Sequence, residues 1–214
     1  AGITPGQGCV GITDEGTPLA AEAERLKFLK TFLHGPKTGA DVGGRFSALT
    51  YFGLVPGALM GVDLPRLVQR ARTMFAACGP AASDNPAAQL GAVLGGLAAA
   101  GCDKLTVLAS PALESFGTWA EQAVSESTGK MGHGMTPIVG EPLRPPASYG
   151  ADRVFMELQL ASQMDRVVEQ QARALADAGR PVVRIIWDDP YDLGGEVAKW
   201  SLATAIVGHL MEIN

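Results

Sequence analysis

The second half of the chain alternates short apolar segments with amphipathic ones, and this alternation constrains the fold more than any other feature. Apolar runs of strand length lie at residues 104–109, 136–139, 153–160 and 181–187. Helical periodicity lies between and after them, at residues 111–125, 164–178 and 191–211. Because parallel strands need long, usually helical connections, this order predicts a mostly parallel sheet covered by helices on both faces.

The first half of the chain predicts fewer strands and more helices. Strands are expected at residues 9–13 and 31–34, on either side of a helix at residues 18–30 that Thr17 caps. A loop rich in glycine and proline follows at residues 35–45. The next three helices are expected at residues 47–60, where Pro56 should introduce a kink, 64–78 and 85–100. The helix that opens at residue 111 has Ser110 as its expected cap.

Acidic residues follow several of the predicted strands. Ligands of open parallel sheets bind at the carboxyl ends of the strands, where we expect the loop of Glu126, Glu141 and the pair Asp188–Asp189. The pair precedes a proline, so it is either part of a metal or substrate site or an ordinary turn.

Composition and charge exclude two classes of partner. The 214 residues are 47% hydrophobic, which is enough to bury a sizeable core. The net charge is −5 and the 17 lysines and arginines form no run, so we expect no nucleic acid partner. The longest apolar stretch, residues 90–102, is shorter than the roughly 20 residues that span a bilayer, so we expect no membrane partner either.

The cysteines and histidines indicate a reducing compartment and no metal. Cys9, Cys78 and Cys102 are odd in number, widely spaced and set among apolar residues, which predicts buried free thiols in a cytoplasmic protein. The three histidines are equally scattered and include no pair at helical ligand spacing. We therefore expect no structural metal.

Two short motifs each place a charged side chain among small residues. Residues 41–47 have the sequence DVGGRFS, and residues 126–130 have the sequence ESTGK. An unpaired charge is costly in a core, so these charges favour a functional interpretation. A carboxylate and a guanidinium of this kind suit proton transfer next to a forming anion.

These motifs resemble those of the phosphoglucose isomerase family. DVGGRFS with the apolar helix after it, ESTGK, VGEP at residues 139–142 and YDLGGEVAK at residues 191–199 stand in the family's order. Residues 47–56, SALTYFGLVP, are similar to the isomerase part of bacterial bifunctional transaldolase/phosphoglucose isomerases.

The resemblance implies a flavodoxin-like sugar isomerase (SIS) fold and an aldose–ketose isomerase of the cytoplasm, active as a homodimer. It implies that glucose 6-phosphate and fructose 6-phosphate interconvert through an enediol, without a metal or redox cofactor. Glu126 falls on the family's base and Arg45 on the cation that stabilises the developing oxyanion. Lys199 falls on the lysine that helps open the sugar ring. The resemblance further implies substrate binding by Gly44, Ser127, Lys130 and Arg153.

The sequence departs from the family's pattern at the ring-opening histidine. Arg153 stands at that position, and an arginine does not exchange protons near neutral pH. Asp152, His133 or a group from a partner chain would then have to replace the histidine.

The family's Ser/Thr-rich phosphate loop is a second departure, since the chain contains no such segment. We therefore expect residues 1–45 to be the end of a first SIS domain whose phosphate loop lies upstream. Residues 46–103 would be linking helices and residues 104–214 a second SIS domain. The chain would then be the C-terminal part of a larger protein, inactive by itself.

Less specific interpretations remain open. Glu126 could be a solvated charge at a helix end, Arg45 part of an ordinary ion pair, and Lys199 an exposed helix cation. The same fold could serve a non-catalytic module that binds a sugar phosphate, which the arginine at the histidine position favours. The apolar helices at residues 48–61 and 89–100 would also suit a domain that only supports dimerisation.

Overall fold

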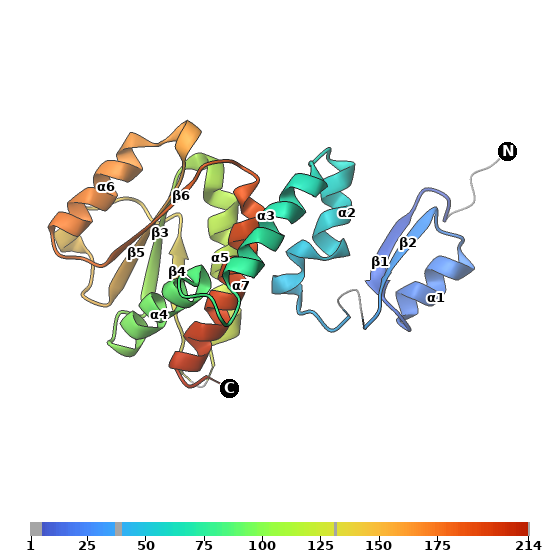
Figure 1. Ribbon diagram of the computed structural model, residues 1–214, viewed down its shortest axis with the longest axis horizontal. Helices are drawn as coiled ribbons and strands as arrows, with labels where there is room; N and C mark the ends of the chain where they lie inside the picture. Colours follow the sequence, from blue (N-terminus) through green and yellow to red (C-terminus); the bar gives the residue numbers. More distant parts are fainter. Residues whose placement is uncertain (1–5, 37–39, 131, 214) are drawn as a thin grey trace. The chain divides into compact units, whose positions relative to one another are not determined.

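The computed structural model describes residues 6–36, 40–130 and 132–213, and the chain divides into two compact units, Ala1–Leu64 and Pro65–Asn214. Figure 1 shows the helices and strands of both units. Residues 37–39 of the loop expected at 35–45, and residue 131 of the ESTGK loop, lie outside the described residues.

The first unit opens with a β-α-β arrangement. Strands β1 (Val10–Asp14) and β2 (Lys30–His34) pair in parallel on either side of α1 (Pro18–Arg25). Thr17 caps α1 as expected, because its Oγ1 accepts the N–H of Ala20 at 3.3 Å. The helix ends five residues earlier than predicted, since Lys27 takes the left-handed conformation (φ 56°) that normally terminates helices at glycine.

The helix predicted at residues 47–60 is two helices. A 3₁₀ helix, η1 (Gly44–Leu49), contains the last four residues of the DVGGRFS motif, and α2 (Tyr51–Leu59) follows. Thr50 separates them in an extended conformation, and its Oγ1 caps α2 by accepting the N–H of Phe52 at 3.3 Å.

The second unit is an α/β domain with a parallel sheet, as the sequence predicts. It contains α3 (Leu64–Ala77), α4 (Pro86–Ala99), β3 (Lys104–Ala109), η2 (Pro111–Leu113), α5 (Glu114–Thr128), β4 (Thr136–Val139), η3 (Pro146–Ser148), β5 (Arg153–Leu160), η4 (Ala161–Gln163), α6 (Arg166–Asp177), β6 (Val182–Trp187) and α7 (Asp192–Leu210). The strand order β4-β3-β5-β6 is parallel throughout and agrees with a flavodoxin-like fold.

Helices cover both faces of this sheet (Figure 1). On one face, Leu108 and Phe155 pack against Val168 and Leu175 of α6. On the other face lie α5 and α7, where the Phe116 ring meets Trp187 edge to face at 5.0 Å. Helix α4 packs on α7 in turn.

Two sequence expectations need correction. Among the cysteines only Cys78 is buried, whereas Cys9 is exposed and Cys102 is half-buried. Ser110 makes no capping bond, because η2 intervenes before α5 begins at Glu114, and its buried hydroxyl has no partner within the described part of the chain. In the residues that the structure describes, no helix is both long and apolar enough to cross a bilayer.

The close packing of α4 on α7 yields a stability prediction. A Cβ on Gly91 would lie 2.7 Å from Cβ of Ile206 and 3.0 Å from the carbonyl oxygen of Ala203. Gly91→Ala should therefore lower the free energy of unfolding by about 1–3 kcal/mol. Gly96 lies on the same helix with nothing near its Cβ position, so Gly96→Ala should raise it by about 0.5–1 kcal/mol. Urea unfolding measures both, and equal effects would contradict the packing described.

Candidate functional site

The DVGGRFS motif forms a turn that presents Arg45. The N–H of Phe46 donates to the carbonyl of Gly43 at 2.9 Å, and the Ser47 hydroxyl donates to the carbonyl of Gly44 at 2.7 Å. The guanidinium of Arg45 lies 5.1 Å from the centre of the Phe46 ring. Arg45 is half-buried, so part of the residue is accessible to solvent.

The backbone conformation of this motif does not require its two glycines. Neither Gly43 nor Gly44 has a positive φ, so a special turn conformation is not what requires them. A Cβ at Gly44 would meet no atom within 4 Å. The space beside Gly44 is therefore open, as it would need to be if a ligand approached the backbone there.

Sequence reasoning missed His34, which anchors the end of this segment. His34 is fully buried at the end of β2, and its Nε2 accepts the N–H of Tyr51 at 3.1 Å. Its ring stacks on Phe52 with 5.0 Å between centroids. This contact fixes the start of α2, directly after the helix that holds Arg45. A lone histidine at a strand end gives no sequence signal for such a role.

The ESTGK motif closes α5. Glu126 is exposed in the last turn of the helix. The ammonium of Lys130 folds back and donates to the carbonyl of Ser127 at 2.6 Å and to that of Glu126 at 3.4 Å. A cation on the terminal carbonyls stabilises a helix end. Lys130 thus holds the turn that presents Glu126.

The expectation that Glu126 lies at the carboxyl edge of the sheet is wrong. Helix α5 follows β3 and runs back along the sheet, and its last residue, Thr128, accepts the N–H of Met135 just before β4 at 3.0 Å. Glu126 therefore lies at the amino edge. Asp188–Asp189 follow β6 at the carboxyl edge, as expected, whereas the Glu141 carboxylate pairs with Arg153, the first residue of β5.

Lys199 is not the exposed helix cation of the simpler interpretation. Its side chain in α7 is 13% exposed, and its Nζ donates to Oε1 of Glu196 at 2.6 Å. The Glu196 side chain is 9% exposed. Burial raises the pKa of Glu196, while Lys199 and the Trp200 indole act in the opposite direction and Asp192 adds a smaller upward effect.

Arg153 is engaged within the second unit. Its Nη1 donates to Thr106 Oγ1 and to Glu141 Oε2, both at 2.7 Å, and the guanidinium lies 5.7 Å from the centre of the Tyr149 ring. The side chains of Arg153 and Glu141 are each 17% exposed. This ion pair joins the start of β5 to the segment after β4, which is a structural role.

Two proposed replacements for the histidine also have structural contacts. Asp152 forms an ion pair with Lys104 at 2.8 Å, and this hydrogen bond holds the pKa of Asp152 below its usual range. His133 is exposed, and its backbone forms a bridge with Lys130.

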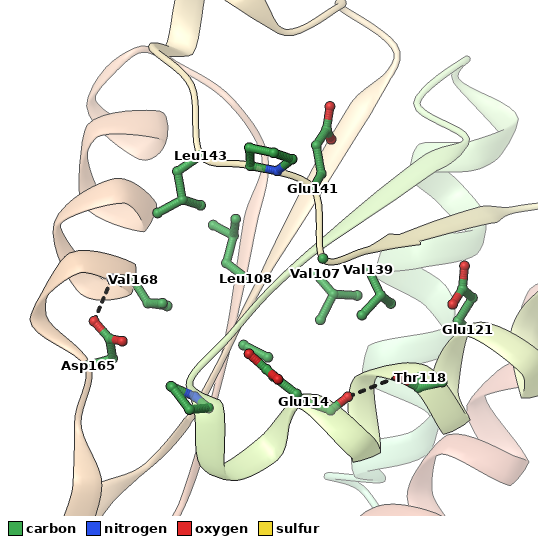
Figure 2. Close-up of a pocket in the computed structure, with 14 residues that line it drawn as sticks. Val107, Leu108, Glu114, Thr118, Glu121, Val139, Glu141, Leu143, Asp165 and Val168 are labelled. Carbon is green, nitrogen blue, oxygen red and sulfur yellow. Dashed lines mark hydrogen bonds between the residues drawn. The ribbon is translucent and has the colours of Figure 1, made fainter.

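A cavity of about 610 Å³ lies at the carboxyl ends of β3 and β4 (Figure 2). Its carboxylates come from α5, from the segment after β4 and from the start of α6, and they are Glu114, Glu121, Glu141 and Asp165. Among the described residues that line it there is no lysine or arginine. Like charges repel, so this cavity is unsuited to a phosphate.

Asp188 and Asp189 belong to the turn before α7. Their N–H groups donate to Oδ2 of Asp192 at 2.9 and 3.1 Å, and Asp189 forms an ion pair with Arg66. Within the parts of the chain that the structure describes, no cluster of His, Cys, Asp and Glu could hold a metal ion.

The predicted site residues are distributed over both units. Gly44 and Arg45 belong to the first unit, and Glu126, Lys199 and Arg153 belong to the second. A common site for Arg45 and Glu126 stays a prediction.

No family model matches the chain. In sequence, the chain is 37% identical over 144 residues to a protein of Haloarcula marismortui named probable glucose-6-phosphate isomerase, covering 65% of this chain and 31% of that protein. It is 30% identical over 202 residues to a protein of the same name from Methanococcus maripaludis, covering 93% of this chain and 42% of that protein. The chain thus spans less than half the length of these curated relatives.

Two solved structures share the fold. A hypothetical protein from Thermus thermophilus superposes with a TM-score of 0.80 at 23% identity, covering 95% of this chain and 58% of that one. A glucose-6-phosphate isomerase from Chlamydia trachomatis superposes with a TM-score of 0.68 at 18% identity, covering 96% of this chain and 48% of that one.

The contacts of Arg153 yield a second prediction. Arg153→Met should lower the free energy of unfolding by about 1–3 kcal/mol, because the half-enclosed Glu141 carboxylate and the buried Thr106 hydroxyl lose their donor. Arg173→Met, on the exposed face of α6, is the matched control and should change it by less than about 0.5 kcal/mol. Chemical denaturation measures both, and a neutral Arg153→Met would contradict the structural role.

Proposed function

Because the chain is related in sequence to the glucose-6-phosphate isomerases, we propose that it is part of a protein that interconverts glucose 6-phosphate and fructose 6-phosphate. The observation that carries this proposal is the similarity to a protein named for that activity over 93% of the chain. The motifs with Arg45, Glu126 and Lys199, in the order of the resemblance, support the same conclusion.

The residues divide the chemistry between proton transfer and charge stabilisation. Glu126 takes the proton from C2 of the open-chain aldose and returns it to C1, so that an enediol forms between the two steps. Arg45 cannot lose its proton, and its fixed charge stabilises the oxygen that becomes negative. Glu126 is exposed in the second unit, and the space beside Gly44 is open in the first, so each position is accessible to a ligand.

The finer assignments also belong to this proposal. Residues 1–45 would complete a first SIS domain, residues 46–103 would link it, and residues 104–214 would form the second. The protein would act as a cytoplasmic homodimer in glycolysis and gluconeogenesis, with a transaldolase joined to the isomerase. Carboxylates line the cavity at the carboxyl edge, which supports a phosphate-binding site outside the second unit.

A non-catalytic module that binds a sugar phosphate is the second candidate. The observation that favours it is the ion pair of Arg153 with Glu141, which occupies the position of the ring-opening histidine.

Exchange of the C2 proton separates the two candidates. The full protein that contains this chain should exchange the C2 proton of glucose 6-phosphate with deuterium oxide, as followed by proton NMR. Glu126→Gln should lower the rate about 10²- to 10⁴-fold, because it removes the base. Glu121→Gln, one turn earlier on α5, is the control and should leave the rate unchanged. If the unmutated protein does not exchange the C2 proton, the isomerase proposal is wrong and the non-catalytic module remains.

Gly44 offers a test of substrate approach. Gly44→Ala adds a methyl group that meets no protein atom within 4 Å, so the melting temperature should not change. If substrate occupies this space, kcat/KM should fall about tenfold or more. Gly57→Ala in α2, whose Cβ would make ordinary contacts of 3.6 Å or more, is the control with normal activity. Normal kcat/KM in Gly44→Ala would place the substrate elsewhere.

A further inference from the structure

Opening a cyclic sugar phosphate needs two groups that exchange protons. One accepts the proton of the O1 hydroxyl, and the other supplies a proton to O5 as the C1–O5 bond breaks. Lys199 can serve as one of them. The contacts of Arg153 and Asp152 described above commit both side chains to ion pairs on another part of the second unit.

Glu196 offers the missing group next to Lys199. Its Oε1 accepts from Lys199 Nζ at 2.6 Å. Its Oε2 is buried and has no hydrogen-bond partner among the residues that the structure describes. Buried carboxylate oxygens are nearly always bonded, so an open acceptor of this kind needs an explanation.

The open acceptor belongs to a residue that lines a cavity. The cavity measures about 260 Å³ and is enclosed by α3, the start of α4, the end of β6 and the first turns of α7. It lies wholly in the second unit, and Glu196 and Asp192 are its acidic lining residues. A space of this size can admit a hydroxyl-bearing molecule or ordered water to the carboxylate.

The charged groups beside Glu196 come from α7 and from α3, which lines the same cavity. On α7, Lys199 is bonded to it and Asp192 lies one turn earlier. From α3, Arg70 faces the same cavity, but its Nε pairs with Oδ1 of Asp192 at 3.4 Å. From β6, Trp187 contributes a neutral indole. Lys199 is therefore the cation that neutralises Glu196.

Building on the isomerase function proposed above, we propose that Glu196 is a catalytic residue that accepts the O1 proton and works with Lys199 to open the sugar ring. As Glu196 takes that proton, the O1–H electron pair forms the C1=O1 double bond. The C1–O5 pair moves to O5, which takes a proton from the Lys199 ammonium. Glu196 is then neutral and Lys199 uncharged, and transfer of the proton from the carboxyl group to the neighbouring amine restores the charged pair.

Burial supports this assignment, because it raises the pKa of Glu196 and so makes its carboxylate a stronger base than an exposed one. Arg153, at the position of the family's histidine, does not exchange protons under these conditions.

Exchange between the α and β anomers of glucose 6-phosphate tests the proposal, because it requires ring opening but no proton transfer at C2. It is measured by two-dimensional exchange NMR on the full protein, above the spontaneous rate. Glu196→Gln should abolish catalysed anomer exchange and slow isomerisation equally. Glu126→Gln should abolish isomerisation, while catalysed anomer exchange continues above the spontaneous rate. Glu196→Asp keeps the carboxyl group and should restore part of the anomer exchange, with a displaced acid limb in its pH profile.

The outcomes separate this proposal from the proposed function. Normal anomer exchange in a folded Glu196→Gln variant overturns the role of Glu196 and leaves the isomerase intact. Loss of anomer exchange in both Glu196→Gln and Glu196→Asp, with a lowered melting temperature, also overturns it in favour of a structural pair. If the unmutated protein exchanges anomers through Glu196 but not the C2 proton, the isomerase fails while Glu196 keeps its ring-opening role.

Discussion

The parallel pairing of four strands is the constraint on which the second unit depends. Each connection must carry the chain back across the sheet before the next strand can begin. Helix α5 therefore starts at the carboxyl end of β3 and ends beside the first residues of β4, which brings Glu126 to the amino edge. Asp188 and Asp189 follow β6 directly and lie at the opposite edge. The proposed base and the acidic cavity thus belong to opposite edges of one sheet.

Two ion pairs of this unit differ in whether the carboxylate keeps an oxygen without a hydrogen-bond partner. The guanidinium of Arg153 is bonded to both Glu141 and Thr106, and the pair closes one side of the sheet. Glu196 uses one carboxylate oxygen for Lys199 and keeps the other without a partner among the described residues, beside a cavity. A partly buried ion pair whose hydrogen bonds are all made stabilises the fold. A carboxylate oxygen without a partner can still bind a ligand or accept a proton.

The sequence predicted strands better than helix ends and buried charges. The strands at residues 104–109, 136–139 and 153–160 have the expected bounds, because compact apolar runs identify buried parallel strands. Helix α1 ends unexpectedly because Lys27, not a glycine, adopts the left-handed conformation. Burial of Glu196 depends on the packing of α3 and β6, which periodicity does not reveal. The edge that holds Glu126 could have been derived, since the predicted order of strands and helices already fixes it.

The carboxylates that line the cavity at the carboxyl edge affect which molecules can approach it. A phosphorylated sugar carries about two negative charges near neutral pH, and Glu114, Glu121 and Asp165 present the same sign to it, whereas Glu141 is paired with Arg153. The repulsion extends over roughly 8–10 Å in physiological salt and further in dilute buffer. These carboxylates therefore disfavour the approach of an anion at the mouth of this cavity, most strongly at low ionic strength.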